Sequence, residues 1–388
     1  MNQLKDLFLL EPEIVFLNHG SFGAIPRPVF EEYQEWQLRL ERQPVRFILS
    51  ELHQHLSEAR EVLANYLNAK PQELVFIPNA THGVNIIARS IALQPGDEVL
   101  TSDHEYGACD NAWEYVCRLT GARYVRQPLP LPAGSSQEIL ERLWRGVTAN
   151  TRMITLSHIT SPTAIRLPVE ALCLRAKEAG ILTFIDGAHA PGQIQLNLEA
   201  LGADFYTGNC HKWMMAPKGS AFLYSRLDRQ ELIEPLVVSW GWGDNSTLNY
   251  GSRYLDLLQW TGTHDPSAAL TVPAAIHFQE QHDWPSVRAG CKRLLCQALE
   301  GLQSLTGLPS NYGEGCPPYS QMASALLPHV GDLDGLKKSL YDGFRVEVPL
   351  VTWNKDHLIR VSIQGYNTQE DVQILLKAMQ ALLPEFSA

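Results

Sequence analysis

Short apolar runs that end abruptly at polar residues are the feature that most constrains the fold of this chain. The clearest run covers residues 181–185 and ends at Asp186. A second short strand, expected at residues 204–206, leads to His211 and Lys212. Runs of this length without polar alternation are typical of strands buried on both faces of a parallel sheet, and the carboxyl ends of such strands build sites at one edge. The sequence therefore predicts an α/β fold with polar groups gathered at one sheet edge.

The same alternation of strand and helix extends over the first 225 residues. Repeated strand–helix units with short turns predict a mostly parallel sheet covered on both faces. Residues 219–225 follow Lys212 too closely for a helical crossover, so we expect that strand to be antiparallel to its neighbour. The other expected strands are 73–77, 98–102, 123–126 and 153–157, and the expected helices are 28–43, 49–69, 84–93, 107–120, 137–147 and 169–179.

The pattern changes after about residue 230, which predicts a second, smaller α+β domain. Residues 240–262 are loop-like, and a helix at 267–280 is expected to lead into that domain. Its last helix begins at a capping-box pattern, Thr368-Gln369-Glu370-Asp371. We expect further elements at 287–305, 333–339, 344–348 and 358–363. The expected division is an N-terminal arm at 1–20, a large domain at 21–265 and a small domain at 266–388.

Composition excludes several classes of partner. The net charge of −11 argues against nucleic acid or an anionic membrane, which select for basic patches. No apolar run reaches the roughly 20 residues of a membrane span, and residues 1–8 do not resemble a signal peptide, so we expect a cytoplasmic protein. The seven cysteines have no C-x-x-C spacing. They indicate reduced thiols, and no metal site is predicted.

Four groups fall at the carboxyl edge of the predicted sheet. Asp186 and Lys212 each follow a strand, as does His104, and residues 79–81 form a strand–turn–helix junction that could seat a phosphate on free amides. An acid that holds a ring nitrogen and an amine that forms a Schiff base are what pyridoxal phosphate requires. The combination is more specific than any one of its members.

Each of these residues also has a simpler interpretation. Thr81 could be only a helix N-cap, and His104 could be a turn residue. Arg46, beside a proline bend, could be a surface ion-pair former. Asn18 and His19 lie in a glycine-rich loop that could be only a helix entry.

The chain resembles the class V aminotransferase family of fold type I pyridoxal phosphate enzymes, and within it the isopenicillin N epimerase-like group. The resemblance spans nearly the whole chain. It rests on the segments 16–23, 43–47, 158–163, 186–189, 211–212 and 261–263.

The resemblance implies a role for each residue around the ring. Lys212 would form the internal aldimine and then move the α-proton of the substrate. Asp186 would pair with the pyridinium nitrogen, and His104 would stack on the ring. His189 would lie near the ring oxygen or the phosphate, where many relatives have glutamine.

The resemblance also implies a phosphate site and a shared dimer. Beside Asn79, the residues Ala80 and Thr81 would donate amides and a hydroxyl, and His211 could add a contact. Thr263 would reach the phosphate from a second subunit, so a homodimer is expected.

Substrate recognition is expected at Arg360, in a strand that otherwise looks buried. Its guanidinium offers the two parallel donors that a carboxylate accepts, and the family places its α-carboxylate arginine in this setting. Asn18, His19 and Arg46 are further candidates for the substrate pocket.

The residues leave the reaction open among three outcomes at an amino acid. Transamination and epimerisation at the α-carbon are preferred to β-elimination of the cysteine or cystine C–S lyase type. Epimerisation requires a second acid, which the sequence does not identify. A cysteine desulfurase is disfavoured because residues 347–353 hold no cysteine and Cys316 lies too far upstream. A non-catalytic binding protein is disfavoured because both Lys212 and Asp186 are present.

Overall fold

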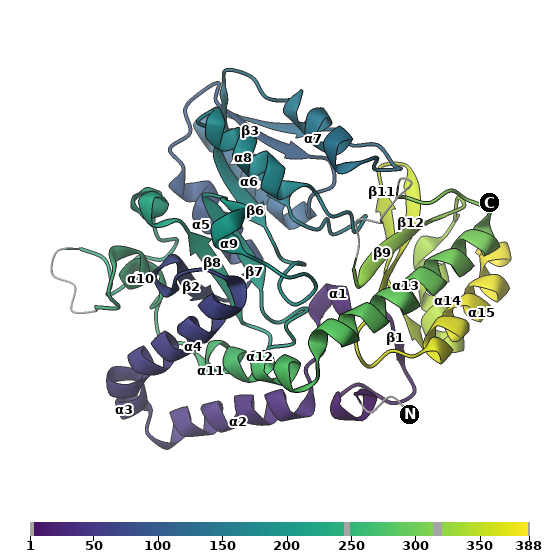
Figure 1. Cartoon of the computed structure of the whole chain (residues 1–388), viewed down its shortest axis with the longest axis horizontal. Coiled ribbons are helices and arrows are strands. Elements are labelled where there is room, and N and C mark those ends of the chain that lie inside the picture. Colours follow the sequence, from purple (N-terminus) through teal and green to yellow (C-terminus); the bar gives the residue numbers. More distant parts are fainter. Residues whose placement is uncertain (1–3, 244–248, 313–319, 387–388) are drawn as a thin grey trace.

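The computed structural model describes residues 4–243, 249–312 and 320–386. Within these residues a central seven-stranded sheet has the order β2-β8-β7-β6-β5-β3-β4 (Figure 1). Strand β8 is antiparallel to both of its neighbours, as predicted, and the pairs among β7, β6, β5, β3 and β4 are parallel. The strands are β2 (Leu74–Ile77), β3 (Glu98–Ser102), β4 (Arg123–Gln127), β5 (Thr151–Ser157), β6 (Leu182–Asp186), β7 (Phe205–Asn209) and β8 (Ala221–Ser225).

Both faces of this sheet carry an apolar core. Along β2, Val75 and Ile77 join one core, and Leu74 and Phe76 join the other. Residues of β3, β7 and β8 are buried throughout, whereas the edge strand β4 has exposed positions. Burial on both faces explains the unbroken apolar runs of the inner strands. The covering helices include α4 (Leu52–Leu67), α5 (Ala80–Ser90), α6 (Gly107–Thr120), α7 (Ser136–Trp144) and α8 (Val169–Glu178).

The C-terminal part has its own antiparallel sheet of order β11-β12-β9. Its strands are β9 (Met322–Leu327), β11 (Leu350–Trp353) and β12 (Asp356–Ser362), and its helices are α13 (Trp284–Thr306), α14 (Leu333–Phe344) and α15 (Gln369–Phe386). The capping box predicted for α15 is present, since Thr368 N–H donates to Asp371 and Asp371 N–H donates to Thr368 Oγ1.

The N-terminal segment belongs to this smaller part of the fold. Strand β1 (Val15–Phe16) pairs in parallel with β10 (Val346–Glu347), and Ser362 N–H donates to Leu17 O. Strand β1 also contacts α15, at the other end of the sequence (Figure 1). The chain then passes through the short helix α1 (His19–Phe22) to the large sheet. The N-terminal segment and the C-terminal part therefore together form the smaller part of the fold, which lies beside the central sheet.

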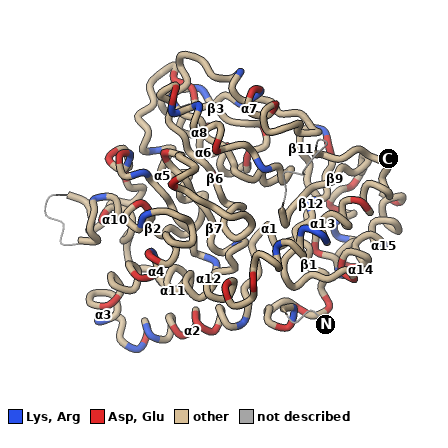
Figure 2. Tube along the Cα trace, in the orientation of Figure 1, with Lys and Arg blue, Asp and Glu red and all other residues tan. Residues whose placement is uncertain are grey.

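Two details of the connections differ from the sequence-based expectation. Helix α10 (Arg253–Leu258) occupies part of the stretch expected to be a loop. Helices α11 (Ser267–Leu270) and α12 (Val272–Gln281) pack on α4 and on α2 (Arg27–Arg42). These contacts run across the boundary expected at residue 266. Figure 2 shows acidic and basic residues interspersed along α2, as on a solvated helix.

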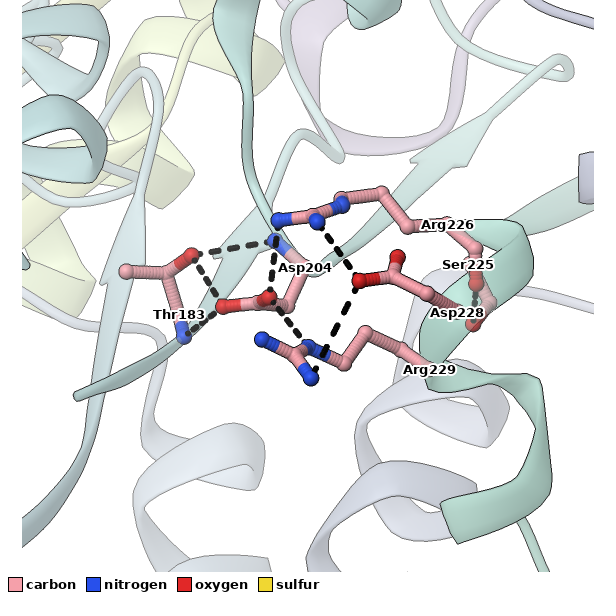
Figure 3. A network of polar contacts seen from close by, with 6 residues as sticks. All are labelled: Thr183, Asp204, Ser225, Arg226, Asp228 and Arg229. Carbon is pink, nitrogen blue, oxygen red and sulfur yellow. Dashed lines mark hydrogen bonds and ion pairs between the residues drawn. The ribbon is translucent and has the colours of Figure 1, made fainter. Parts of the chain in front are cut away.

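A polar network ties the amino ends of β6 and β7 to the end of β8 (Figure 3). The buried Asp204 carboxylate accepts hydrogen bonds from Thr183 N and Oγ1 at 2.9 and 3.1 Å. Its other oxygen accepts from Arg226 Nη1 at 3.2 Å and from Arg229 Nε at 2.8 Å. The network anchors the two strands whose opposite ends deliver Asp186 and Lys212.

Among the helices that the structure describes, none combines the length and the apolar character of a membrane-spanning segment.

Candidate active site

A cavity of about 280 Å³ lies at the carboxyl edge of the central sheet. It collects groups from loops after β2, β3, β5, β6 and β7 and from the N-terminal segment, so residues far apart in sequence share it. A larger cavity of about 450 Å³, between the N-terminal segment and α15, is lined by other residues. The lining of the smaller cavity is Ser21, Phe22, Asn79, Ala80, Thr81, Tyr106, Ser157, Ile159, Ser161, Asp186, Ala188, His189, Asn209, His211 and Lys212.

Lys212 follows β7 and presents its amine to this cavity. The pKa of Lys212 is lowered to about 8, first by burial and then by the positive charge of Arg360, against the opposing effect of Asp186. The neutral fraction of this amine at neutral pH is therefore larger than that of a free lysine, which favours its action as a nucleophile. Its Nζ lies 3.2 Å from Nε2 of His189.

Asp186 ends β6 with its carboxylate held from two sides. Oδ1 accepts from Ala188 N–H at 2.9 Å, and Oδ2 accepts from the buried Cys109 thiol at 3.2 Å. Burial raises the pKa of Asp186, while these two hydrogen bonds and the charge of Lys212 oppose the rise. The carboxylate is therefore oriented before any ligand arrives.

A second carboxyl, Glu105, lies behind Ser157. Its oxygens accept from Ser102 Oγ at 2.6 Å and from Ser157 N and Oγ at 2.8 and 2.6 Å. Burial raises the pKa of Glu105 to about 7 despite these hydrogen bonds. Because Ser157 pairs with Asp186 across β5 and β6, the two carboxyls belong to one local network.

His189 lies between Lys212 and Trp213. Its Nδ1 accepts from Trp213 Nε1 at 3.4 Å. Burial, together with the charges of Lys212 and Arg360, lowers the pKa of His189 well below its usual value, so the imidazole is neutral.

The turn at residues 79–81 has the geometry of an anion seat. Asn79 caps α5 through His82 N–H at 2.9 Å, and the first turn of the helix opens on the cavity. The Ala80 amide already donates to Asn209 Oδ1 at 2.8 Å. His211 Nδ1 lies 3.1 Å from Ser220 O, and burial lowers the pKa of His211 to about 4.

Arg360, on β12, lies directly behind the cavity wall. Its Nη1 donates to Ser161 O at 2.6 Å and to Ser161 Oγ at 3.2 Å, and its Nη2 donates to Ser21 Oγ at 3.0 Å. Burial lowers the pKa of Arg360 to about 10. In the described part of the chain no carboxylate pairs with it, and its Nε has no hydrogen-bond partner. A buried guanidinium without a counter-ion is suited to bind an anionic ligand.

The N-terminal candidates contribute from outside the cavity lining. Asn18 Oδ1 accepts from Ser21 Oγ at 2.5 Å, so it orients that hydroxyl. The fully buried His19 contacts Lys212 O through Nε2 at 3.1 Å and Tyr366 Oη through Nδ1 at 3.0 Å. Both residues thus support the site rather than line it.

Three further predicted residues are not brought to the cavity of this chain. Arg46 is exposed at the end of α3 (Pro44–Arg46) and pairs with Glu51 at 2.8 Å. Thr263 is exposed and does not line the cavity either. Neither Arg46 nor Thr263 therefore contributes to the cavity of its own chain.

His104 is the third predicted residue that does not line the cavity, although it was expected to stack on the cofactor ring. Its ring nitrogens bond Thr163 Oγ1 at 2.7 Å and Leu129 O at 2.8 Å, and its ring centroid lies 4.2 Å from that of Trp353. The contact with β11 turns the histidine into the protein, so Tyr106, two residues on, lines the cavity instead.

The sequence reasoning also missed Ser21, Phe22, Ser161 and Cys109. Ser21, Phe22 and Ser161 lie inside segments that carry the family resemblance, and that resemblance is the sequence signal that could have found them. Nothing in the sequence pattern indicated that Cys109, in the first turn of α6, would contact Asp186.

The chain belongs to the aminotransferase class-V family, whose profile matches residues 16–375. It is 37% identical to isopenicillin N epimerase of Amycolatopsis lactamdurans, over 96% of each chain, and 34% identical to isopenicillin N epimerase of Streptomyces clavuligerus, over 99% of this chain and 98% of that one. It is also 29% identical to a probable chloroplastic L-cysteine desulfhydrase of Arabidopsis thaliana, over 96% of this chain and 84% of that protein.

Solved structures share the fold at lower identity. The apo cysteine desulfurase of Thermococcus onnurineus NA1 superposes with a TM-score of 0.84 at 21% identity, covering 99% of this chain and 98% of that one. The cystine C–S lyase C-DES with its product cysteine persulfide gives a TM-score of 0.83 at 21% identity, with both chains fully covered. The fold is thus fold type I of the pyridoxal phosphate enzymes, as expected.

Pyridoxal 5′-phosphate is the cofactor of this class, and the donor set fits it. Lys212 offers a buried amine for the aldehyde, Asp186 an oriented carboxylate for the ring nitrogen, and α5 an amino end for the phosphate. These three groups line one cavity, which is the arrangement that the cofactor requires.

Proposed function

We propose that this protein is a pyridoxal phosphate enzyme that removes and returns the proton on the α-carbon of an amino acid, with epimerisation as its main outcome. The observation that carries the proposal is the Lys212 amine, whose pKa burial lowers to about 8, facing the same cavity as Asp186. Similarity to two isopenicillin N epimerases over nearly the whole chain supports the choice of outcome.

Lys212 has two roles in this proposal. Its amine holds the cofactor covalently and, once the substrate has displaced it, becomes the base at the α-carbon. Asp186 would keep the ring nitrogen protonated, and the chemistry that the bound cofactor would supply is stabilisation of negative charge at the α-carbon. His189, held between Lys212 and Trp213, is the group next to the reacting amine.

Arg360 is proposed to bind the α-carboxylate of the substrate. It lies against Ser161 and Ser21, whose hydroxyls line the cavity, and its charge is not neutralised by a carboxylate in the described part of the chain. A bidentate contact would fix the orientation of the α-carbon.

The phosphate is proposed to bind at residues 79–81 with help from His211. Completion of this seat by Thr263 of a second subunit would make a homodimer the working unit. The exposed position of Thr263, away from the cavity of its own chain, is compatible with that arrangement.

The second candidate is β-elimination from cysteine or cystine, favoured by similarity to proteins named L-cysteine desulfhydrases. It needs no protein thiol. A desulfurase thiol would be expected near β11, where the sequence holds no cysteine and Trp353 packs on His104. Cys316 lies outside the described residues.

The cofactor proposal is tested by absorbance. Purified protein should show a band at about 420 nm that borohydride shifts and that Lys212→Ala lacks, because the band reports the lysine–cofactor linkage. A colourless protein that takes up no cofactor would overturn the enzyme assignment and favour a binding protein.

The reaction is tested by incubating holoenzyme with L- and D-amino acids, including cystine, in deuterated water. α-Deuteration with inversion supports epimerisation. Keto acid without sulfide indicates transamination, and pyruvate with a sulfur product indicates the lyase; either result without inversion would refute epimerisation as the main outcome.

A further inference from the structure

Tyr106 presents a phenol hydroxyl at the cavity wall, on the side of Asp186 away from Lys212. It precedes α6 in the loop after β3 and lines the same cavity as Lys212. The side chain is 49% exposed, and in the described part of the chain its Oη makes no hydrogen bond. It is therefore accessible to a ligand in the cavity.

The strand order places Tyr106 and Lys212 on opposite sides of Asp186. Lys212 follows β7, Asp186 ends β6, and Tyr106 follows β3, which lies beyond β5 in the order β7-β6-β5-β3. Neighbouring strands are about 4.8 Å apart, so β7 and β3 are separated by about 14 Å. Lys212 and Tyr106 would therefore approach a ligand held at Asp186 from opposite sides.

Tyr106 also lies near the proposed carboxylate anchor. Its phenol is close enough to Arg360 to raise the pKa of that guanidinium, against the effect of burial. A substrate held by Arg360 would place its α-carbon within the part of the cavity that Tyr106 borders.

The lining groups nearest Arg360 are less suited than a phenol to deliver a proton. The hydroxyls of Ser21 and Ser161 accept hydrogen bonds from Arg360, and Phe22 and Ile159 are apolar. His104 faces away into the protein, between Thr163 and Leu129.

We propose that Tyr106 is the second catalytic acid, acting on the face of the α-carbon opposite Lys212. This inference rests on the proposed epimerisation. The Lys212 amine takes the α-proton, and the electron pair of the broken C–H bond stays with carbon and the cofactor ring. The O–H bond of Tyr106 then breaks, and its proton forms the new C–H bond on the other face. Lys212 is left as ammonium and Tyr106 as phenolate, and exchange with solvent restores both. The reverse direction uses the phenolate as base.

The test compares Tyr106→Phe with wild-type holoenzyme in deuterated water, each enantiomer supplied separately. The variant should still exchange the α-proton of the enantiomer that faces Lys212, within about tenfold, but should lose inversion by at least about 100-fold, the usual contribution of a general acid. Tyr115→Phe, at an exposed tyrosine on α6, is the matched control and should invert normally.

Two readouts do not depend on turnover. Spectral titration should give both enantiomers the same affinity in Tyr106→Phe as in wild type, which separates proton delivery from binding. In the apoprotein, tetranitromethane should nitrate Tyr106 and Tyr115, and pyridoxal phosphate with an amino acid should protect only Tyr106, as read by peptide mass spectrometry.

The outcomes separate the two proposals. If wild type inverts and Tyr106→Phe inverts equally fast, the role of Tyr106 is refuted while the proposed function stands. Failure of ligands to protect Tyr106 from nitration would also refute it. If wild type inverts no amino acid, the proposed epimerisation falls, and the role of Tyr106 falls with it.

Discussion

The Nζ of Lys212 lies 3.2 Å from Nε2 of His189, while Trp213 Nε1 donates to the other nitrogen of the same ring. An indole N–H can only donate, so Nδ1 of the neutral imidazole must carry the lone pair and Nε2 the hydrogen. The imidazole is then a donor to Lys212, and the amine accepts in its neutral form. This agrees with a Lys212 pKa lowered to about 8.

Trp213→Phe should remove the hydrogen bond that holds His189 in the tautomer with its hydrogen on Nε2. Without the indole donor, His189 can carry its hydrogen on either nitrogen, and Nε2 can accept from a protonated Lys212. We expect ¹⁵N spectra of the apoprotein to change from the Nε2–H form to a mixture, and the pH midpoint of cofactor capture to move upward. Trp144→Phe, on α7, is the control. An unchanged spectrum in Trp213→Phe would show that the indole does not select the tautomer.

Arg360→Gln should change both the pH dependence of cofactor capture and the affinity for amino acids. The rate of capture by wild-type apoprotein should rise with pH through about 8, where Lys212 loses its proton. Arg360 is the second cause that lowers this pKa, so the midpoint should move upward in the variant. Loss of a charged donor pair should weaken amino acid binding by about 10- to 100-fold.

The control for that experiment is Arg118→Gln, an exposed change on α6. Spectral titration with a panel of amino acids gives the affinities. If Arg360→Gln binds every amino acid as wild type does, the carboxylate role is wrong.

Glu105→Gln should alter how stability depends on pH. Burial raises the pKa of Glu105 from 4.5 to about 7, so the folded state holds this proton more tightly than the unfolded chain. The contribution of Glu105 to stability is therefore complete below about pH 4.5 and lost as pH rises toward 7. The variant lacks this loss, so its free energy of unfolding should rise relative to wild type between pH 5 and 8.

Urea unfolding across this range provides the measurement, with Glu178→Gln at an exposed position of α8 as control. A constant difference between Glu105→Gln and wild type over the whole range would contradict the raised pKa.

Asp204→Asn should destabilise the central sheet. The buried carboxylate neutralises Arg226 and Arg229 and binds Thr183 (Figure 3), and loss of its charge leaves two partly buried guanidinium groups under-compensated. We expect a loss of about 2–4 kcal/mol in the free energy of unfolding. The exposed partner in the same network, changed as Asp228→Asn, should cost less than about 1 kcal/mol. Equal losses for the two variants would show that burial does not decide the cost.

The local hydrophobic pattern of the sequence predicted those strands and helices whose type follows from which of their residues are buried. Strand β3 and helix α6 have the bounds expected for them, since an unbroken apolar run and a helical stripe define each one. Strand β9 was not predicted because Met-Ala-Ser-Ala-Leu-Leu has no strand periodicity, and only its pairing with β12 makes it a strand. Helix α10 was missed among glycine and polar residues.

In the site, the sequence located strand ends more reliably than side-chain directions. Asp186 and Lys212 follow inner strands directly, so parallel strand geometry was enough to bring them together. The sequence could not show that Tyr106 and not His104 lines the cavity. That outcome depends on Trp353, which lies in a distant hairpin, donates to Asp103 O at 2.9 Å and packs on His104. A contact between residues so far apart leaves no local signal.

The parallel pairing of β1 with β10 has a consequence for the order of synthesis. Val15 leaves the ribosome long before its partner Val346 exists, and the segment that carries Ser21 and Phe22 follows Val15 immediately. The sheet that carries Asp186 and Lys212 can form earlier, from residues already made. During translation the reactive amine is thus assembled first, and the wall that orients the substrate closes over it only when the last part of the chain emerges.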